Sequence, residues 1–355
     1  MDYLFFLIEP TENDWQRIEA SPDYTCFHSS GWSNYLNHIG RRPFIVHISA
    51  NNKDVGYFIG STRRLLITLL GSPIDSSGTY CQGLCLLEAS KPEERIDIYK
   101  QLFQWVRKQY HIHYMQVCDW QLRVVTHEWT PPSQLNFFAL DTAHITYTLR
   151  TTFFVDTLAS EQQLWSNLTY KSCKYAINKA QKEGLTIRQI ERKEDIPAFI
   201  DIHYRQIQDV FNRKGMKPMH YQRKENLMAL CESLFPDKVI MLQVWGDDHD
   251  GQEQCMSSAI FCPGKAASTY FTGASFRQFM KYCPNELMVW DGMKKLHAMG
   301  AGDLIFTGVA HYKKKFGSLY ASLPMMVFTS FGILFTLRTF IKKAYGRMRN
   351  ILSKQ

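Results

Sequence analysis

Three consecutive lysines in the segment His311–Tyr320 (HYKKKFGSLY) are the residues best suited to chemistry. Nine basic residues and no acid lie between His311 and Gln355, and the remaining 32 of the 41 Lys and Arg residues face 33 Asp and Glu. A lysine cation can hold a phosphate or carboxylate, or charge that develops during group transfer. The alternative is that all three lysines are solvated in a turn. This local excess favours a local anionic partner over a nucleic-acid coat across the surface.

Other kinds of catalytic site find little support in the sequence. There is no Gly-x-Ser-x-Gly nucleophile motif and no glycine-rich phosphate loop after a strand. His111 and His113 alternate along one segment without a third ligand at metal-binding spacing, so no metal is expected. The nine cysteines have irregular spacings, which predicts free, buried or half-buried thiols in a reducing compartment. The N-terminus has no basic start before its short apolar run, so a cytoplasmic protein is expected.

The elements that must position the lysines mix strands and helices in both halves. In the first half, Phe44–Ile48 and Val55–Ile59 read as a strand pair around a polar turn. Pro92–Tyr110 has helical spacing of its apolar residues, and Ile112–Val117 is strand-like. Leu65–Leu70 is a further apolar run.

The second half continues the pattern. The strands are expected at 153–155, 186–190, 239–245, 255–261, 267–272, 303–307 and 321–328, and the helices at 160–184, 195–214, 222–234 and 286–299. The three lysines fall between its last two strands. The order of elements predicts an α+β protein of two domains, which also suits the length of 355 residues.

Several short motifs, taken in order, resemble the FemAB-type branch of the GNAT acyltransferases and the BioF2-like acetyltransferase domain. They are Phe27–Trp32 (FHSSGW), Lys174-x-x-Ile177-x-Lys179-Ala180, Gly273 after a strand, Asn285 before a helix, and Tyr312-Lys313-x-x-Phe316-Gly317. Two positions depart from the family pattern, because Lys174 stands for the usual Arg and Tyr312 for the usual Phe. Lysine keeps the positive charge of arginine but cannot make its bidentate hydrogen bonds. The resemblance spans about residues 25–320.

The resemblance implies two tandem GNAT-like domains, each a mixed, mostly antiparallel sheet flanked by helices, with a cleft between them. It implies an amide-forming transfer in which an amine attacks an activated acyl group directly, without a covalent enzyme intermediate. Lys313 would be the catalytic cation, and Lys314 and Lys315 would be surface residues. The residues expected to bind substrate are Lys174, Lys179, Tyr270, Gly273, Asn285 and Tyr312.

The acyl donor is expected to be aminoacyl-tRNA or another acyl carrier such as a thioester, with no bound cofactor. Ser275–Pro284 stands where acetyl-CoA-dependent members of the superfamily have a glycine-rich pyrophosphate loop, and it contains no glycine. Backbone donors reach a diphosphate less easily past side chains. Arg277 and Lys281 offer side-chain contacts to phosphate instead, or are simply exposed helix charges. The expected acceptor is a cell-envelope glycan or peptide precursor, with tRNA as a further partner if it is the donor.

The expected domains are residues 1–147 and 148–328, followed by a basic amphipathic helix over 329–355. Its apolar stripe could contact an anionic membrane or pack on the protein. Two other functions stay open: a non-catalytic, membrane-peripheral assembly factor in polysaccharide synthesis, and a CoA-dependent N-acetyltransferase. A peripheral position on the inner face of the cell membrane would suit a lipid-linked acceptor.

Overall fold

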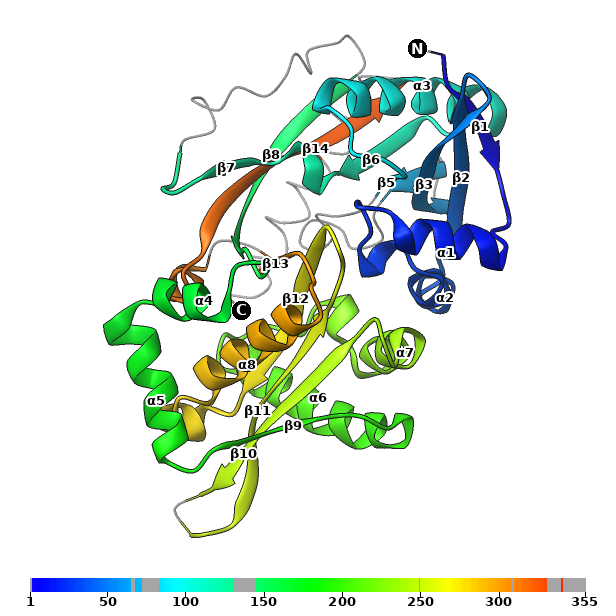
Figure 1. Cartoon of the computed structure of the whole chain (residues 1–355). Coiled ribbons are helices and arrows are strands. Elements are labelled where there is room, and N and C mark those ends of the chain that lie inside the picture. Colours follow the sequence, from blue (N-terminus) through cyan, green and yellow to red (C-terminus); the bar gives the residue numbers. More distant parts are fainter. Residues whose placement is uncertain are drawn as a thin grey trace.

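The computed structural model describes residues 2–64, 68–71, 83–130, 145–248, 250–307, 310–330 and 340. The described residues form one mixed sheet of 14 strands flanked by helices (Figure 1). The strand order is β1-β2-β3-β4-β6-β14-β8-β13-β12-β11-β10-β9, with β5 paired to β3 and β7 to β14. Among the described pairs, β4–β6 and β12–β13 are parallel and the others antiparallel.

The N-terminal half, residues 2–130, supplies one end of this sheet and three helices among the described residues. Its elements are β1 (Leu4–Leu7), α1 (Glu12–Ala20), α2 (Ser30–His38), β2 (Arg42–Ala50), β3 (Lys53–Arg64), β4 (Thr68–Gly71), β5 (Gly83–Leu86), α3 (Pro92–Tyr110), β6 (Tyr114–Cys118) and β7 (Val124–Thr126).

The C-terminal half, residues 145–307 with the turn His311–Phe316, supplies the other end. Its elements are β8 (Ile145–Val155), α4 (Glu161–Asn167), α5 (Tyr175–Lys182), β9 (Thr186–Gln189), α6 (Ile196–Asn212), α7 (Lys224–Leu234), β10 (Ile240–Asp247), β11 (Glu253–Cys262), β12 (Ala267–Ser275), α8 (Pro284–Ala298) and β13 (Asp303–Ile305). A 3-10 turn, His311–Phe316, then leads into β14 (Leu319–Thr329).

Strand β14 joins the two halves. It pairs with β8 from Leu319, opposite Phe154, to Phe328, opposite Ile145. On its other edge it pairs with β6, from Met325 to Thr329. Figure 1 shows β8 and β14 running together from α4 toward α3. The last strand among the described residues therefore connects sheet regions that lie far apart in the chain.

Two helical layers cover opposite faces of the C-terminal sheet. Along β10 and β11 the side chains alternate between two cores, as the pleat of a strand requires. Leu242 and Phe261 join a core with α5 and α8, whereas Met241 and Ile260 join a core with α6 and α7. When a helix packs one apolar stripe against such a face, the burial of its apolar side chains is the main interaction that holds it there.

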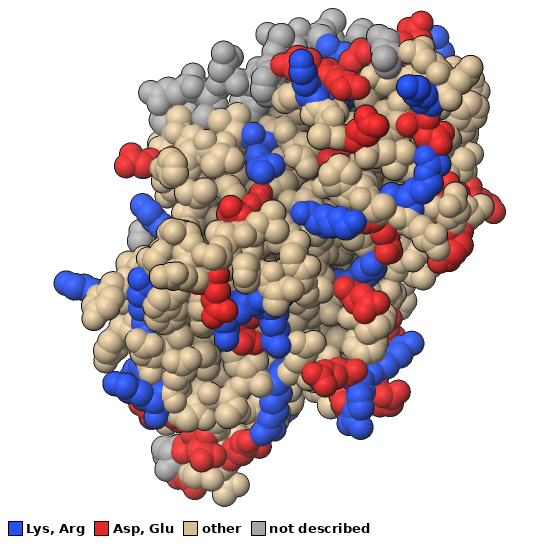
Figure 2. Space-filling view, in the orientation of Figure 1, with Lys and Arg blue, Asp and Glu red and all other residues tan. Residues whose placement is uncertain are grey.

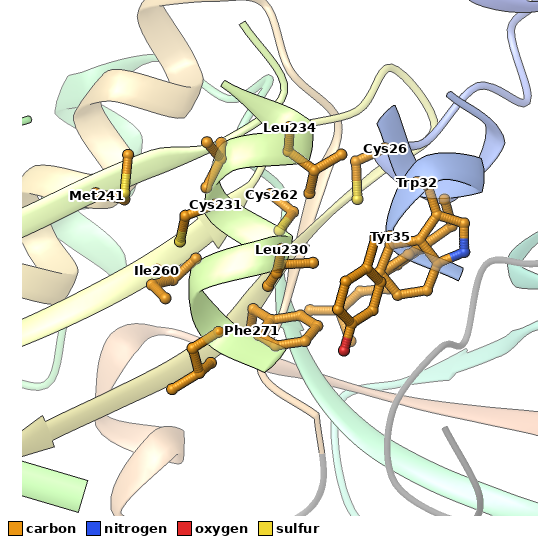
Figure 3. Close-up of a cluster of buried hydrophobic side chains, with 14 of the residues drawn as sticks. Cys26, Trp32, Tyr35, Leu230, Cys231, Leu234, Met241, Ile260, Cys262 and Phe271 are labelled. Carbon is orange, nitrogen blue, oxygen red and sulfur yellow. The ribbon is translucent and has the colours of Figure 1, made fainter. Parts of the chain in front are cut away.

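The two halves also share a core. Trp32 and Tyr35 of α2 lie among buried residues of α7 and of strands β10 to β12, including Leu230 and Leu234 (Figure 3). A Cβ atom on Gly31 would lie 2.2 Å from the carbonyl oxygen of Ser233. Only glycine allows α2 to approach α7 this closely. The FHSSGW motif is therefore needed where the halves pack together.

Most of the predicted elements are confirmed. The helix over Pro92–Tyr110 has the expected ends, and the strand pair in the first half extends to Arg42–Ala50 and Lys53–Arg64. The segment 160–184 is two α-helices separated by a π-helical turn, Tyr170–Lys174. Eight described cysteines are free, seven of them buried and Cys283 half-buried, as expected. Sequence periodicity gave no prediction of β1, α1 or α2.

Some predictions stay open. The predicted boundary between residues 147 and 148 falls inside β8 and stays a prediction. The basic helix expected over 329–355 lies outside the described residues except at Thr329, Ser330 and Phe340, and Leu65–Ile67 also lie outside them. Within the described ranges, no helix has both the length and the apolar character needed to cross a membrane.

Candidate acyl-transfer site

Lys313 is buried rather than directed into bulk water. It lies in the 3-10 turn before β14, and 7% of its surface is exposed. Its Nζ atom donates to the carbonyl oxygen of Phe306 and, at 3.0 Å, to that of Thr307. Thr307 has a φ of 50°, in the left-handed region that non-glycine residues seldom adopt. The backbone after β13 is thus shaped to present two carbonyls to this ammonium group.

The ammonium group of Lys313 is held by dipoles and not by a counter-ion. The ion pairs among the described residues include none with Lys313. Burial lowers the pKa of Lys313 from 10.5 to about 8. An ammonium has three N–H donors, and the recorded contacts use two of them. The group is therefore mostly charged at neutral pH, with one donor left for a further oxygen.

Tyr270 and Gly273 lie together on β12. The hydroxyl oxygen of Tyr270 would be 1.7 Å from a Cβ atom on Gly273, so only glycine leaves room for this tyrosine. A register shift between Ile260 and Phe261 of β11 marks the bulge that brings both residues to the same face. Burial raises the pKa of Tyr270 well above its usual value, and Tyr312 and Glu286 raise it further. Tyr270 is thus a neutral hydroxyl close to Tyr312 and Glu286.

Asn285 fixes the beginning of α8 against the sheet. Its Oδ1 atom accepts hydrogen bonds from Ser275 Oγ at 2.6 Å and from Ser257 Oγ at 3.2 Å. Both serines are buried strand residues, so these bonds satisfy polar groups that water cannot reach. Asn285 therefore holds the first turn of α8 in place. In this structure its amide oxygen is engaged with protein rather than open to a ligand.

Glu286 and Lys315 form an ion pair that brings three segments together. The pair joins α8 to the 3-10 turn, and both side chains are less than one-fifth exposed. Thr169 N donates to Lys315 O at 2.9 Å, which ties the turn to the segment after α4. The expectation that Lys315 is a surface residue is therefore wrong, because Glu286 draws it inward. Lys314, by contrast, is exposed as predicted.

Lys174 and Lys179 lie beside this ion pair. Lys174 Nζ donates to Ser166 O at 3.0 Å. The pKa of Cys283 is raised by burial and by Glu286, while Lys179 and Lys315 oppose the rise, so all three charged groups are near this thiol. Two positive side chains, Lys174 and Lys179, thus lie near the ion pair.

The structure thus brings the seven predicted site residues into one region of the C-terminal half. Phe306 stacks on Phe316 at 5.6 Å, and Tyr270 lies 5.9 Å from Phe306 between ring centroids. The ring of Tyr312 is 53% exposed, and Lys313 Nζ lies 5.8 Å from its centroid. The surface ring and the buried ammonium are therefore neighbours. Whether these residues bind substrate stays a prediction.

The segment without glycine, Ser275–Pro284, makes a tight turn nevertheless. Arg277–Tyr282 is a 3-10 helix, and Cys283 after it takes the left-handed conformation with φ 61°. The side chain of Arg277 is exposed, and Lys281 Nζ lies 4.9 Å from the centroid of the Tyr282 ring. Side chains, not a bare backbone, therefore cover the approach to α8.

Two cavities lie where the N- and C-terminal halves meet. One, of about 310 Å³, is lined by Glu19 and Tyr24 from the first half and by Lys238 and Lys265 from the second. The other is a small space beside His28, Arg95 and Ala266. Neither of these two cavities is lined by Lys313.

Two residues of the site were missed by sequence reasoning as functional residues. Glu286 directly follows Asn285, and Lys315 lies two residues after Lys313, but they are 29 residues apart. An acid in the first turn of a predicted helix is the only local signal, and it is common at helix N-termini. The pairing of the two residues could not be inferred without the fold.

Comparison with known proteins identifies the fold. No protein-family model and no curated protein matches the sequence. A solved structure of FemX is similar at 13% identity and a TM-score of 0.65, covering 91% of this chain and 97% of FemX. L-PGS from Bacillus licheniformis is similar at 8% identity and a TM-score of 0.51, covering 96% of this chain and 98% of L-PGS. A protein of unknown function from Bacteroides thetaiotaomicron has 9% identity and a TM-score of 0.52.

The likeness is one of fold, since the identities are very low. The chain shares the fold of FemX and L-PGS, as its FemAB-like motifs predicted. The match extends along nearly the whole chain, so it includes both halves and their arrangement.

Proposed function

We propose that the protein transfers an acyl or aminoacyl group to an amine, with Lys313 as the catalytic cation. The observation that carries the proposal is the environment of Lys313, a buried ammonium held by two carbonyls next to the ring of Tyr312. Burying a cation without a counter-ion costs free energy. An opposite charge that appears only during a reaction would recover this cost in the transition state.

In the proposed reaction, the acceptor amine attacks the acyl carbon directly. A C–N bond forms, and the carbonyl oxygen becomes an oxyanion that the third N–H of Lys313 can stabilise. The C–O bond of an ester or the C–S bond of a thioester then breaks. The proton released by the amine ends on the departing oxygen or sulfur. No enzyme nucleophile takes part, in keeping with the missing nucleophile motif.

The proposed donor is aminoacyl-tRNA or an acyl thioester, and the proposed acceptor is a cell-envelope glycan or peptide precursor. The resemblance of the motifs to the peptidoglycan-modifying branch supports this choice. So does Ser275–Pro284, where side chains stand in place of a glycine-rich loop. The positive residues Lys174 and Lys179 at one side of the site suit an anionic substrate.

A transfer assay with labelled donors tests the proposal. The purified full chain is incubated with labelled aminoacyl-tRNA or acetyl-CoA and an amine-bearing envelope precursor fraction, and labelled amide is measured. Loss of one oxyanion donor typically lowers the rate by about 100- to 1000-fold, so Lys313→Ala is expected to lose that much. Lys314→Ala is the matched control, because Lys314 is the exposed neighbour, and it should keep the wild-type rate.

The outcomes separate the alternatives. Equal rates for folded Lys313→Ala and Lys314→Ala would refute the role of Lys313. Transfer from acetyl-CoA alone would indicate a CoA-dependent N-acetyltransferase. No transfer from either donor would favour the non-catalytic assembly factor.

A further inference from the structure

A basic groove lies at one end of the N-terminal sheet, where β3 ends and β4 and β6 begin. The groove has a cavity of about 850 Å³. Among its described lining residues, every side chain that carries a full charge is an arginine, and the other lining residues are neutral or titratable, including threonines and a glycine. The principal members are Arg42, Arg63, Arg64, Tyr110, His111 and His113. We call it the arginine groove. No aspartate or glutamate is among the lining residues that the structure describes.

The three arginines of the groove are exposed and lack a carboxylate partner among the described residues. Some surface arginines elsewhere do have such a partner, as Arg17 does in Asp54 at 2.6 Å. On the face shown in Figure 2, basic and acidic side chains are interspersed. An unpaired guanidinium presents five N–H donors in a planar fork that suits phosphate oxygens. Three of them around one cavity form a site for a phosphate-bearing surface.

The C-terminal sequence begins at this groove. Ser330, directly after β14, donates from its backbone N to His113 O at 3.1 Å. Residues 331–355 carry six basic residues, no acid and many apolar residues. Basic side chains alone would suit many polyanions. Basic and apolar residues together suit an anionic bilayer, which offers phosphate head groups above acyl chains.

The arginine groove is separate from the candidate acyl-transfer site. Lys313 precedes β14 and His113 lies beside its end, so the 11 residues of this strand separate them. At about 3.3 Å per residue, the strand spans roughly 33 Å. Figure 1 shows β14 extending from the region of α4 to that of α3.

We infer that the arginine groove binds the phosphate head groups of an anionic phospholipid surface. The groove would hold the N-terminal half on the membrane, with the candidate acyl-transfer site about 30 Å away along β14. This inference is independent of the proposed reaction, since a non-catalytic protein could use the same surface.

Vesicle co-sedimentation of the full chain tests the inference. Vesicles of phosphatidylglycerol and phosphatidylcholine are compared with vesicles of phosphatidylcholine alone. Each basic residue near an anionic surface contributes about 1 kcal/mol, a factor of about five in the partition coefficient. The triple variant Arg42→Gln/Arg63→Gln/Arg64→Gln should therefore bind about 100-fold more weakly. The control Lys193→Gln/Lys214→Gln/Lys217→Gln removes three exposed charges from the C-terminal half and should bind like wild type.

Two further measurements keep the result decisive. If the triple variant fails to fold, Arg64→Gln alone should lower partitioning about fivefold. Inorganic phosphate is compared with chloride at equal ionic strength, and phosphate should release the protein from vesicles more effectively than chloride does, because it competes for the same guanidinium groups. Wild-type binding to both vesicle types, or to neither, would overturn the inference. Unchanged vesicle binding by the triple variant would also overturn it, and if the variant instead lost binding to tRNA, the groove would be a nucleic-acid site.

Discussion

Arg95 in the N-terminal half and Lys313 in the C-terminal half are both buried cations, but their surroundings differ in one decisive respect. Arg95 is 1% exposed and contacts two carboxylates, Asp23 at 2.6 Å and Asp119 at 2.8 Å. Lys313 is 7% exposed and contacts two neutral carbonyls. The first cation is more than neutralised by its neighbours, and the second keeps an unbalanced positive charge.

The Arg95 cluster has the features of a structural network. Tyr99 donates to Asp119 at 2.8 Å, and Asp23 also accepts from Leu86 N at 3.0 Å. Burial lowers the pKa of Arg95, but the two carboxylates outweigh this and raise it. The partners come from the loop before α2, from α3 and from the end of β6, so the cluster ties distant segments of the N-terminal half together.

The comparison shows that burial alone does not distinguish a structural charge from a functional one. A cation that is fully paired with carboxylates stabilises an oxyanion formed nearby very little, because the carboxylates already cancel its electric field. Lys313 has the same low exposure but no carboxylate to cancel its field. The difference gives the following predictions, from the largest effect on stability to the smallest.

Arg95→Met should be strongly destabilising. Removing one partner of a buried ion pair leaves uncompensated charge and typically costs about 3–5 kcal/mol in the free energy of unfolding, measured by urea denaturation. Lys224→Met breaks the exposed pair with Asp201 and should cost less than about 1 kcal/mol. If both variants lost the same small amount, the Arg95 cluster would not be the structural network described.

The stability of the wild type relative to Lys313→Met should depend on pH. Below pH 8 both folded and unfolded states hold the proton, and above 10.5 neither does. Between these values the unfolded state binds more protons, so the unfolding free energy of the wild type rises with pH relative to the variant. Between pH 8 and 10.5, the unfolding free energy of the wild type relative to the variant should rise by about 3 kcal/mol in total. Urea denaturation at several pH values measures it, and a flat difference would show that burial does not depress this pKa.

Lys315→Met should have the smallest effect, because both side chains of its ion pair with Glu286 keep some contact with solvent, at 19% and 16% exposed. The expected loss in the free energy of unfolding is about 1 kcal/mol. The double variant Lys315→Met/Glu286→Gln should lose less than the sum of the two single variants, since they share one interaction. Additive losses would mean that the pair contributes nothing to joining α8 to the turn.

Local patterns in the sequence were enough to predict elements, and the ordered motifs were enough to predict the fold. Pro92–Tyr110 was recognisable because its apolar spacing, its N-terminal proline and its basic last turn all agree. The order of short motifs, through its resemblance to the FemAB-type branch, predicted that Lys313, Tyr270 and Asn285 belong to one site. Within each element or motif, the residues that carry the signal lie within a few positions of one another.

Contacts between distant segments could not be predicted in the same way. Asp23 and Arg95 are 72 residues apart, and neither position has a periodic signal that points to the other. The strand near 321–328 was predicted from its composition, but its pairing with both β6 and β8 was not. The inward turn of Lys315 depends on Glu286, which lies across the C-terminal core. In each case the partner is set by tertiary packing.

Titration of Lys313 in the folded protein tests the central claim most directly. Lysine side chains are labelled for NMR, the Lys313 signal is assigned from Lys313→Arg, and its proton loss is followed with pH. The account predicts a pKa of about 8, with acyl transfer slowing as the pH rises through the same value. A pKa at the ordinary lysine value of 10.5, or transfer that is unchanged while Lys313 loses its proton, would contradict it.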